Sequence, residues 1–149
     1  MTITFCGHSV FYATEEHEQR IMTILKEKIG EEVADIYLGG YGAFDEFAYN
    51  CCKKFKEINP KVSLFFITPY MTEEYQKNNL REKEKLYDGI IYPEIEDKPL
   101  RFAITYRNKW MADKCDFLIC AVAHKWGGAY KTYQYAKQKG KEIINILNL

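Results

Sequence analysis

Several features that would place this chain in a well-defined class are missing from its sequence. No apolar run approaches the roughly 20 residues that a membrane-spanning helix needs, so we expect no membrane partner. Lys+Arg and Asp+Glu both number 21, and the formal net charge is zero. We therefore do not expect nucleic acid as a partner, because its binding draws on surplus positive charge. The five cysteines show no Cys-x-x-Cys spacing, which favours small buried apolar side chains over disulfides.

Other absences bear on location and chemistry. The N-terminus enters strand-like sequence without a secretory signal pattern, and with the cysteine usage this predicts a reducing, cytoplasmic compartment. The Gly-Lys-Ser/Thr ending of a triphosphate-binding loop is missing, and we expect neither a metal nor a cofactor. No repeat, low-complexity tract or linker divides the sequence, which predicts one domain over residues 1–149.

What the sequence does contain is an alternation of strand and helix patterns. Strands are predicted from short apolar runs at residues 2–6, 33–38, 62–68, 89–92, 116–122 and 142–147. Helices are predicted at residues 15–29, 44–58, 99–114 and 128–139. The highly charged segment 73–86 is interpreted as an exposed helix or a lid. This alternation indicates an α/β fold, a Rossmann-like, doubly wound and mostly parallel sheet flanked by helices.

A glycine-rich turn, Gly39-Gly40-Tyr41-Gly42, separates the second strand from the helix that follows it. Glycines permit a sharp turn and the close approach of a ligand, and a helix N-terminus offers free N–H groups and partial positive charge. Asp45 and Glu46 stand in the first turn of this helix. Asp45 is explained equally well by the helix dipole or by ligand contact. An acid would repel phosphate, so Glu46 is predicted to face sugar hydroxyls or to stabilise positive charge on a ribose ring.

Three other strand ends carry candidate binding residues, since ligands of such sheets bind beyond the carboxyl ends of the strands. Gly7-His8-Ser9 follows the first strand, and His8 is either a solvated turn residue or a donor to phosphate. Pro69-Tyr70 follows the third, where the tyrosine either stacks on a base or packs in the core. Trp126-Gly127-Gly128 is a second glycine pair before a helix, and Trp126 is either a stacking or lid residue or a loop anchor. Two such turns fit the two ends of a nucleotide-like molecule.

The predicted helix at residues 99–114 carries a polar pair beside its apolar face. Ile104, Met111 and Cys115 recur at helical spacing, and Arg107 and Asn108 fall on or beside this stripe. A buried polar group is costly unless protein or ligand satisfies its hydrogen bonds. We therefore expect Arg107 and Asn108 to line or buttress the binding site.

The segment Gly39–Glu46 resembles the Gly-Gly-x-Gly-Thr-x-x-Glu motif of the LOG (lysine-decarboxylase-like) phosphoribohydrolases and the glycine turn of the wider SLOG superfamily. Small, stand-alone YspA-like SLOG proteins are similar at Phe5–His8, at Arg107–Asp113, at Asp116 and at Gly127-Gly128. This resemblance implies a Rossmann-like domain that binds a nucleotide, ADP-ribose-like or related ligand, and in an enzyme it makes Glu46 the catalytic carboxylate that stabilises an oxocarbenium-like state. Ser9 and Ala43 depart from the motifs, where an arginine and a hydroxyl residue are expected.

These observations predict the binding of a nucleotide-derived small molecule (ADP-ribose-like, cyclic or a mononucleotide) by a sensor, carrier or sequestering module. The first alternative is an N-glycosidic hydrolase acting on nucleoside monophosphates. A DNA-processing accessory and a nucleoside deoxyribosyltransferase are less favoured, the latter because Thr132 replaces the nucleophilic glutamate. A homo-oligomer is compatible with the sequence. The predicted ligand-binding residues are Gly7, His8, Ser9, Gly39, Gly40, Tyr41, Gly42, Asp45, Glu46, Pro69, Tyr70, Arg107, Asn108, Trp126, Gly127 and Gly128.

Overall fold

The computed structural model describes residues 1–149 and is built on one six-stranded sheet in the order β4-β3-β2-β1-β5-β6. Every neighbouring pair of strands is parallel. The strands are β1 (Thr2–Gly7), β2 (Ala34–Leu38), β3 (Val62–Ile67), β4 (Gly89–Ile91), β5 (Phe117–Ala121) and β6 (Glu142–Asn145). The predicted strands are therefore all present, with ends that differ by one or two residues.

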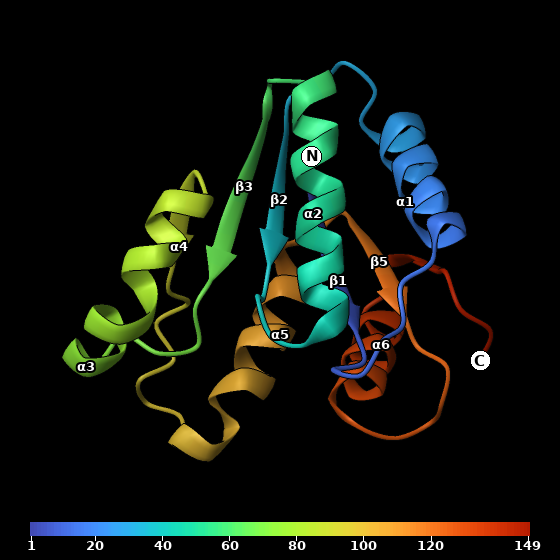
Figure 1. Cartoon of the computed structure of the whole chain (residues 1–149). Coiled ribbons are helices and arrows are strands. Elements are labelled where there is room, and N and C mark those ends of the chain that lie inside the picture. The colour runs from blue at the N-terminus through green and yellow to red at the C-terminus, as the bar shows by residue number, and fades with distance from the viewer.

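Helices connect the strands in the predicted alternation (Figure 1). They are α1 (Glu15–Lys28), α2 (Ala43–Ile58), α3 (Glu73–Tyr75), the π-helical turn η1 (Gln76–Leu80), α4 (Arg81–Leu86), the 3-10 turn η2 (Leu100–Phe102), α5 (Ala103–Lys114) and α6 (Gly128–Gln138). None of them combines the length and the apolarity that crossing a membrane requires.

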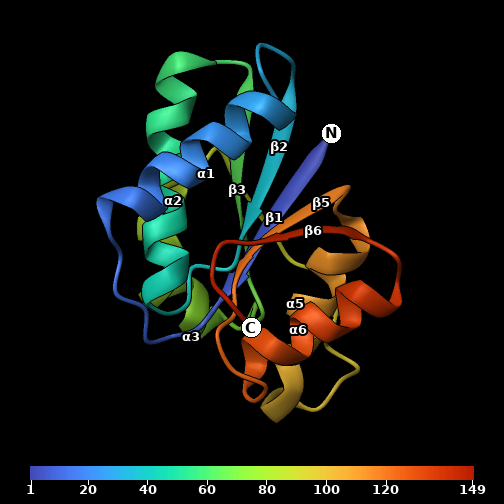
Figure 2. The same cartoon turned by 90° about the vertical axis from the view of Figure 1, so that its right-hand side faces the viewer.

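The two faces of the sheet are covered by different helices (Figure 2). α1 and α2 pack on one face, whereas α5 and α6 pack against each other on the opposite face. This follows from the strand order, because β1, β2 and β3 proceed in one direction and the chain then returns to place β5 on the other side of β1. Right-handed crossovers running in opposite directions put their helices on opposite faces. The doubly wound, Rossmann-like fold is confirmed.

Alternate residues of β1 supply two separate apolar cores. Ile3 and Phe5 face α1 and α2, whereas Cys6 faces the smaller core beneath α5 and α6, with Ala112 and Ala136. All five cysteines are buried and free, as their interpretation as small apolar residues predicted. The alternation places each strand end at a fixed position relative to both helical layers.

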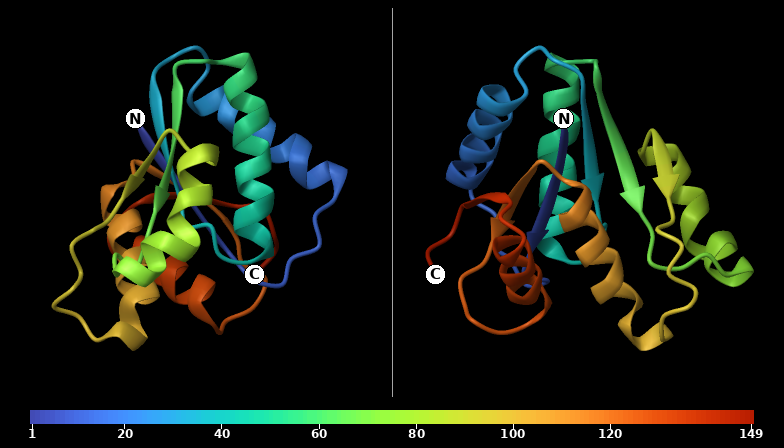
Figure 3. Two further views of the ribbon diagram at one scale, coloured as in Figure 1. Left: turned by 60° about the vertical axis from the view of Figure 1, so that its left-hand side comes forward. Right: turned by 180° about the vertical axis from the view of Figure 1, so that it is seen from behind.

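Two predicted helices have a different form. The charged segment 73–86 is divided into α3, η1 and α4, and lies beside β3 and β4 at the edge of the sheet (Figure 3). It is exposed over most of its length, but Leu80 is buried in the larger core together with Tyr87. The segment predicted as one helix from Pro99 to Lys114 is broken at Phe102, whose φ of -108° and ψ of 7° lie outside the helical region.

Candidate functional site

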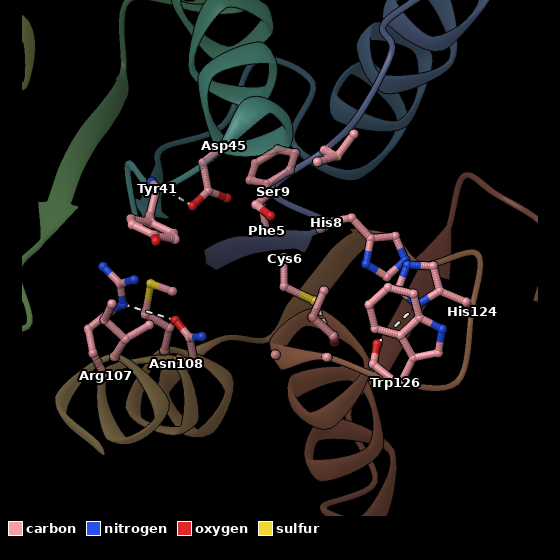
Figure 4. Close-up of a pocket in the computed structure, with 17 residues that line it drawn as sticks. Phe5, Cys6, His8, Ser9, Tyr41, Asp45, Arg107, Asn108, His124 and Trp126 are labelled. Atoms are coloured by element: carbon pink, nitrogen blue, oxygen red, sulfur yellow. Dashed lines mark hydrogen bonds between the residues drawn. The ribbon is translucent and has the colours of Figure 1, made fainter. Parts of the chain in front are cut away.

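A cavity of about 330 Å³ lies at the carboxyl ends of β1 and β5 (Figure 4). The strand order reverses at this point, which is where open α/β sheets bind their ligands. Its walls come from the end of β1, the β2–α2 turn, α5 and the β5–α6 loop. The volume is at the small end of the range for small-molecule sites. The residues that line it are Phe5, Cys6, Gly7, His8, Ser9, Val10, Tyr41, Asp45, Ile104, Arg107, Asn108, Met111, His124, Trp126, Gly127, Gly128 and Ala129.

The structure brings ten of the predicted binding residues together around this cavity. They are Gly7, His8, Ser9, Tyr41, Asp45, Arg107, Asn108, Trp126, Gly127 and Gly128. Those outside its lining are Gly39, Gly40, Gly42, Glu46, Pro69 and Tyr70. The binding roles of all sixteen stay predictions.

Arg107 is the buried cation of the site, with only 2% of its surface exposed. Its Nη1 donates to the carbonyl oxygens of Gly39 and Ile67, both at 2.8 Å. Its Nε donates to Oδ1 of Asn108 at 2.9 Å, which fixes the plane of the guanidinium. Nη2 has no partner among these bonds, yet the structure contains no buried side-chain nitrogen without a partner. This nitrogen therefore keeps some exposed surface, in a side chain that lines the cavity.

Asp45 is the carboxylate of the same cavity. One of its oxygens, Oδ2, accepts a hydrogen bond from the backbone N–H of Tyr41 at 2.9 Å. Loss of solvent raises the pKa of Asp45 to about 6. The Tyr41 hydrogen bond and the positive charges of Arg107 and Lys83 act in the opposite direction and only partly offset this effect. The carboxyl group therefore changes charge close to neutral pH.

Asp45 and Arg107 do not pair with each other. The four ion pairs of the structure join other residues, and Figure 4 shows the Asp45 and Arg107 side chains apart from each other at the end of the cavity away from the ring column. Burial lowers the pKa of Arg107 and the charge of Asp45 partly restores it, so the two groups interact through the space between them. A donor and an acceptor that face one space without contact suit a polar molecule bound between them.

The first glycine turn is closed by the protein itself. Gly42 has a φ of +91°, and a Cβ there would lie 2.7 Å from Cα of Ser9. The backbone N–H of Ala43 donates to the Ser9 carbonyl oxygen at 2.9 Å. A Cβ on Gly40 would lie 2.5 Å from the Phe66 ring. Packing and backbone conformation alone require glycine at both positions, and the approach of a ligand to them stays a prediction.

The second glycine turn is open. Gly127 has a φ of +90°, and no heavy atom lies within 4 Å of a Cβ built on Gly127 or on Gly128. No side chain caps α6 at Gly127, and the first turn of this helix contains no acid. The N-terminus of α6 therefore presents the positive end of its helix dipole to the cavity without a capping side chain.

Three aromatic rings form a column at the other end of the cavity (Figure 4). The His124 ring lies between those of His8 and Trp126, with centroid distances of 3.7 Å on both sides. His8 Nε2 accepts from the N–H of Ala123 at 3.0 Å, while burial and the charge of His124 lower the pKa of His8. These effects favour a neutral His8 ring whose Nε2 accepts and whose Nδ1 carries the proton, so donation by His8 to a phosphate stays a prediction.

Glu46 lies in a separate hollow of about 480 Å³ between α2 and α4, whose wall also includes Lys83 and Asp45. Its side chain is exposed. Successive helix residues point about 100° apart, so Asp45 borders both spaces whereas Glu46 borders only the second hollow. Pro69 and Tyr70 lie beyond β3, where Tyr70 packs against Tyr75 with ring centroids 5.2 Å apart.

His124 lines the cavity and is not among the predicted binding residues, although it stands two residues before Trp126. A signal was available, because two aromatic residues at alternate positions of a loop project to the same side when the backbone is extended. Ile104 and Met111 form the apolar lining of the cavity. In the sequence they appear as an apolar stripe at helical spacing, a pattern that is typical of core packing.

Comparison with known proteins gives similarity in structure alone. No protein-family model matches the sequence, and no curated protein matches it. The X-ray structure of DNA processing protein A (DprA) from Streptococcus pneumoniae has a TM-score of 0.65 and 15% identity, over 95% of this chain and 48% of that one. DprA from Helicobacter pylori has a TM-score of 0.63 and 18% identity, over 96% of this chain and 63% of that one.

These identities establish a shared Rossmann-like fold, and this chain spans less than two thirds of the length of either protein. The prediction that nucleic acid is not a partner is contradicted, because the H. pylori structure describes single-stranded DNA binding by a protein of this fold. The physical reason is that net charge sums the whole surface. Zero net charge from 21 basic and 21 acidic residues leaves their local distribution undetermined.

Proposed function

We propose that the chain is a single SLOG-like domain that binds a nucleotide-derived small molecule, of about mononucleotide size, in the cavity between β1 and β5. The observation that carries the proposal is the pair of unmatched polar groups there. Arg107 is 2% exposed, and its Nη2 has no hydrogen-bond partner in the protein. One carboxyl oxygen of Asp45 accepts a hydrogen bond from the Tyr41 N–H. Such a pair in a concave, partly apolar site is the usual form of a small-molecule site.

The site offers distinct surroundings for the parts of a nucleotide. The open N-terminus of α6 and the guanidinium of Arg107 suit a phosphate group. Asp45 suits hydroxyl donors, since a carboxylate in the first turn of a helix repels an anion. The ring of Trp126, 69% exposed, offers an apolar face for a base.

Thermal unfolding of the full chain with a panel of ligands tests the proposal. The panel contains the four nucleoside monophosphates, cyclic nucleotides, ADP-ribose and single-stranded oligothymidylate. A bound nucleotide at about 100 times its Kd adds about 2.7 kcal/mol of stability. Stabilisation by oligothymidylate alone would favour the DNA-binding alternative. If no small molecule of the panel stabilises the chain and none co-purifies by mass spectrometry, the proposal is wrong.

Gly128→Ala is the sharpest variant, because its Cβ enters space that no protein atom occupies. The added methyl group stands at the open helix end, so we expect nucleotide binding to weaken at least tenfold. The fold should remain intact, since Ala favours a helix over Gly by up to about 1 kcal/mol. Lys131→Ala, an exposed change on the same helix, serves as the control and should bind as wild type does.

Hydrolysis of an N-glycosidic bond is the second candidate, and the pKa of about 6 at Asp45 favours it. A carboxyl group that titrates near neutral pH can act as a general acid or base. In that case Asp45, which borders the cavity, is the catalytic carboxylate in place of Glu46. Chromatography of nucleoside monophosphates incubated with the protein separates the two functions: a hydrolase releases free base, whereas a binding module returns the nucleotide unchanged.

A further inference from the structure

The ring column at the end of the cavity is built from two separate chain segments. His8 follows β1, while His124 and Trp126 belong to the β5–α6 loop. The His8 and His124 rings are inclined by 13°, and those of His124 and Trp126 by 18°. The two outer rings thus both stack on the His124 ring, each at a centroid distance of 3.7 Å. A slot of that width accommodates one flat ring.

His8, one wall of this slot, and His124, its central ring, are held by different hydrogen bonds. His8 is attached to the loop through the 3.0 Å bond from the Ala123 N–H to its Nε2. His124 is held by a single hydrogen bond, from its Nδ1–H to the Trp126 carbonyl oxygen at 3.1 Å. None of the three rings belongs to either apolar core, and His124 is partly exposed. Rotation of its side chain would therefore leave the packing of both cores unchanged.

We propose that the space between the rings of His8 and Trp126 is the base-binding slot of the site, and that His124 occupies it in place of a nucleobase. This inference rests on the proposed function and specifies which part of the ligand enters where. A base that enters the slot displaces the His124 ring and stacks between the neutral imidazole of His8 and the indole of Trp126. Stacking on aromatic faces tolerates any of the bases, because each has a π-face.

The position of the slot also determines where the sugar and phosphate of the ligand lie. Gly127 and Gly128 follow Trp126 directly in the chain and line the same cavity. A base held against Trp126 therefore brings its own sugar phosphate toward the open N-terminus of α6. Asp45 and Arg107 lie across the cavity from the ring column (Figure 4), where the ribose hydroxyls and the remaining phosphate oxygens are in reach. The ring that His124 supplies keeps the apolar slot filled between binding events.

Calorimetry with two probes, AMP and ribose 5-phosphate, separates base from sugar phosphate. His124→Ala removes the ring that competes with the base, and should raise the affinity for AMP about fivefold, as expected when a competing conformation is removed. Trp126→Ala removes one wall and should lower the affinity for AMP about tenfold. Both variants should bind ribose 5-phosphate as wild type does. Lys125→Ala, in the same exposed loop, should leave the ratio of the two affinities unchanged.

The outcomes distinguish this inference from the proposed function. If wild type binds AMP but His124→Ala weakens that binding or leaves it unchanged, the ring is not a competitor and the slot is refuted while the function stands. Equal changes for AMP and ribose 5-phosphate refute it as well. If wild type binds neither probe nor any other nucleotide, the proposed function fails and the slot fails with it. A second measurement is the emission of Trp126 in a Trp110→Phe background, which AMP should change and ribose 5-phosphate should not.

Discussion

Replacement of Asp45 by asparagine should make the protein more stable and weaken its ligand binding. The carboxyl group is held in the cavity wall with one hydrogen bond, from Tyr41, and without an ion pair. Desolvation raises its pKa from the ordinary 3.8 to about 6. Asparagine keeps an oxygen that can accept the Tyr41 hydrogen bond, and it carries no charge to desolvate.

The magnitude follows from the two pKa values. A carboxyl with a pKa of about 6 when folded and 3.8 when unfolded destabilises the folded state by about 3 kcal/mol once it is ionised, as an upper limit. The folded state holds the proton more tightly, so this group lowers the stability of wild type as the pH rises from about 4 to 7. Asp45→Asn has no ionisable group at this position and does not lose this stability as the pH rises. We expect it to exceed wild type by about 1–3 kcal/mol at pH 7.5 and to equal it below pH 4.

Urea denaturation of both proteins at several pH values measures this difference. Glu46→Gln is the matched control, because it removes the same charge from the next residue, which is exposed, and should change stability by less than about 0.5 kcal/mol at every pH. Binding of AMP should weaken roughly tenfold or more in Asp45→Asn, because a charged acceptor is lost, and not in Glu46→Gln. A variant that is less stable than wild type at pH 7.5, or a difference independent of pH, would refute a desolvated carboxylate at this position.

Other substitutions test the walls of the site. Gly42→Ala should destabilise the protein by about 1–3 kcal/mol in thermal unfolding, because its φ is +91° and the added Cβ meets Ser9; unchanged stability would contradict this geometry. Arg107→Lys should cost about 2–4 kcal/mol in urea denaturation, because one ammonium group cannot replace the bonds to Gly39, Ile67 and Asn108. A neutral effect would mean that these bonds contribute little. Gly128→Ala, by contrast, should raise the melting temperature slightly while it weakens nucleotide binding, and loss of the fold would show that this glycine is structural.

Much of the fold could be predicted because it depends on local patterns. The apolar runs at β2, β3 and β5 are nearly continuous, as expected for strands buried on both faces of a parallel sheet. Glycine turns marked the strand ends. Which strands are neighbours could not be derived from the sequence, because crossover order depends on contacts between distant segments. The break at Phe102 was missed for the same reason, since no glycine or proline stands at that residue to indicate it.

The candidate site was predictable by region and not by side chain. The segments around His8, Tyr41, Arg107 and Trp126 meet at one cavity, as the rule for strand ends requires. Whether Asp45 or Glu46 faces that cavity depends on the rotation of α2 and on the segments that surround its first turn. The apolar pattern of α2 indicates its buried face, but it does not show which of two neighbouring acids borders a cavity formed with distant segments. The stacking of His124 likewise depends on a loop that has no periodicity.

The two glycine turns are alike in sequence but opposite in what they leave free. At α2, the Ser9 carbonyl and the Asp45 carboxylate accept the N–H groups of Ala43 and Tyr41, so the turn is satisfied internally and presents negative charge. At α6, no side chain caps the helix and no acid follows, so the turn presents positive potential. A bound molecule with one anionic end and several hydroxyl groups has its lowest electrostatic energy in one orientation only, with the anion toward α6. The site therefore selects the orientation of its ligand as well as the ligand itself. Asp45→Lys reverses the charge at α2 and should weaken this preference while the fold stays intact.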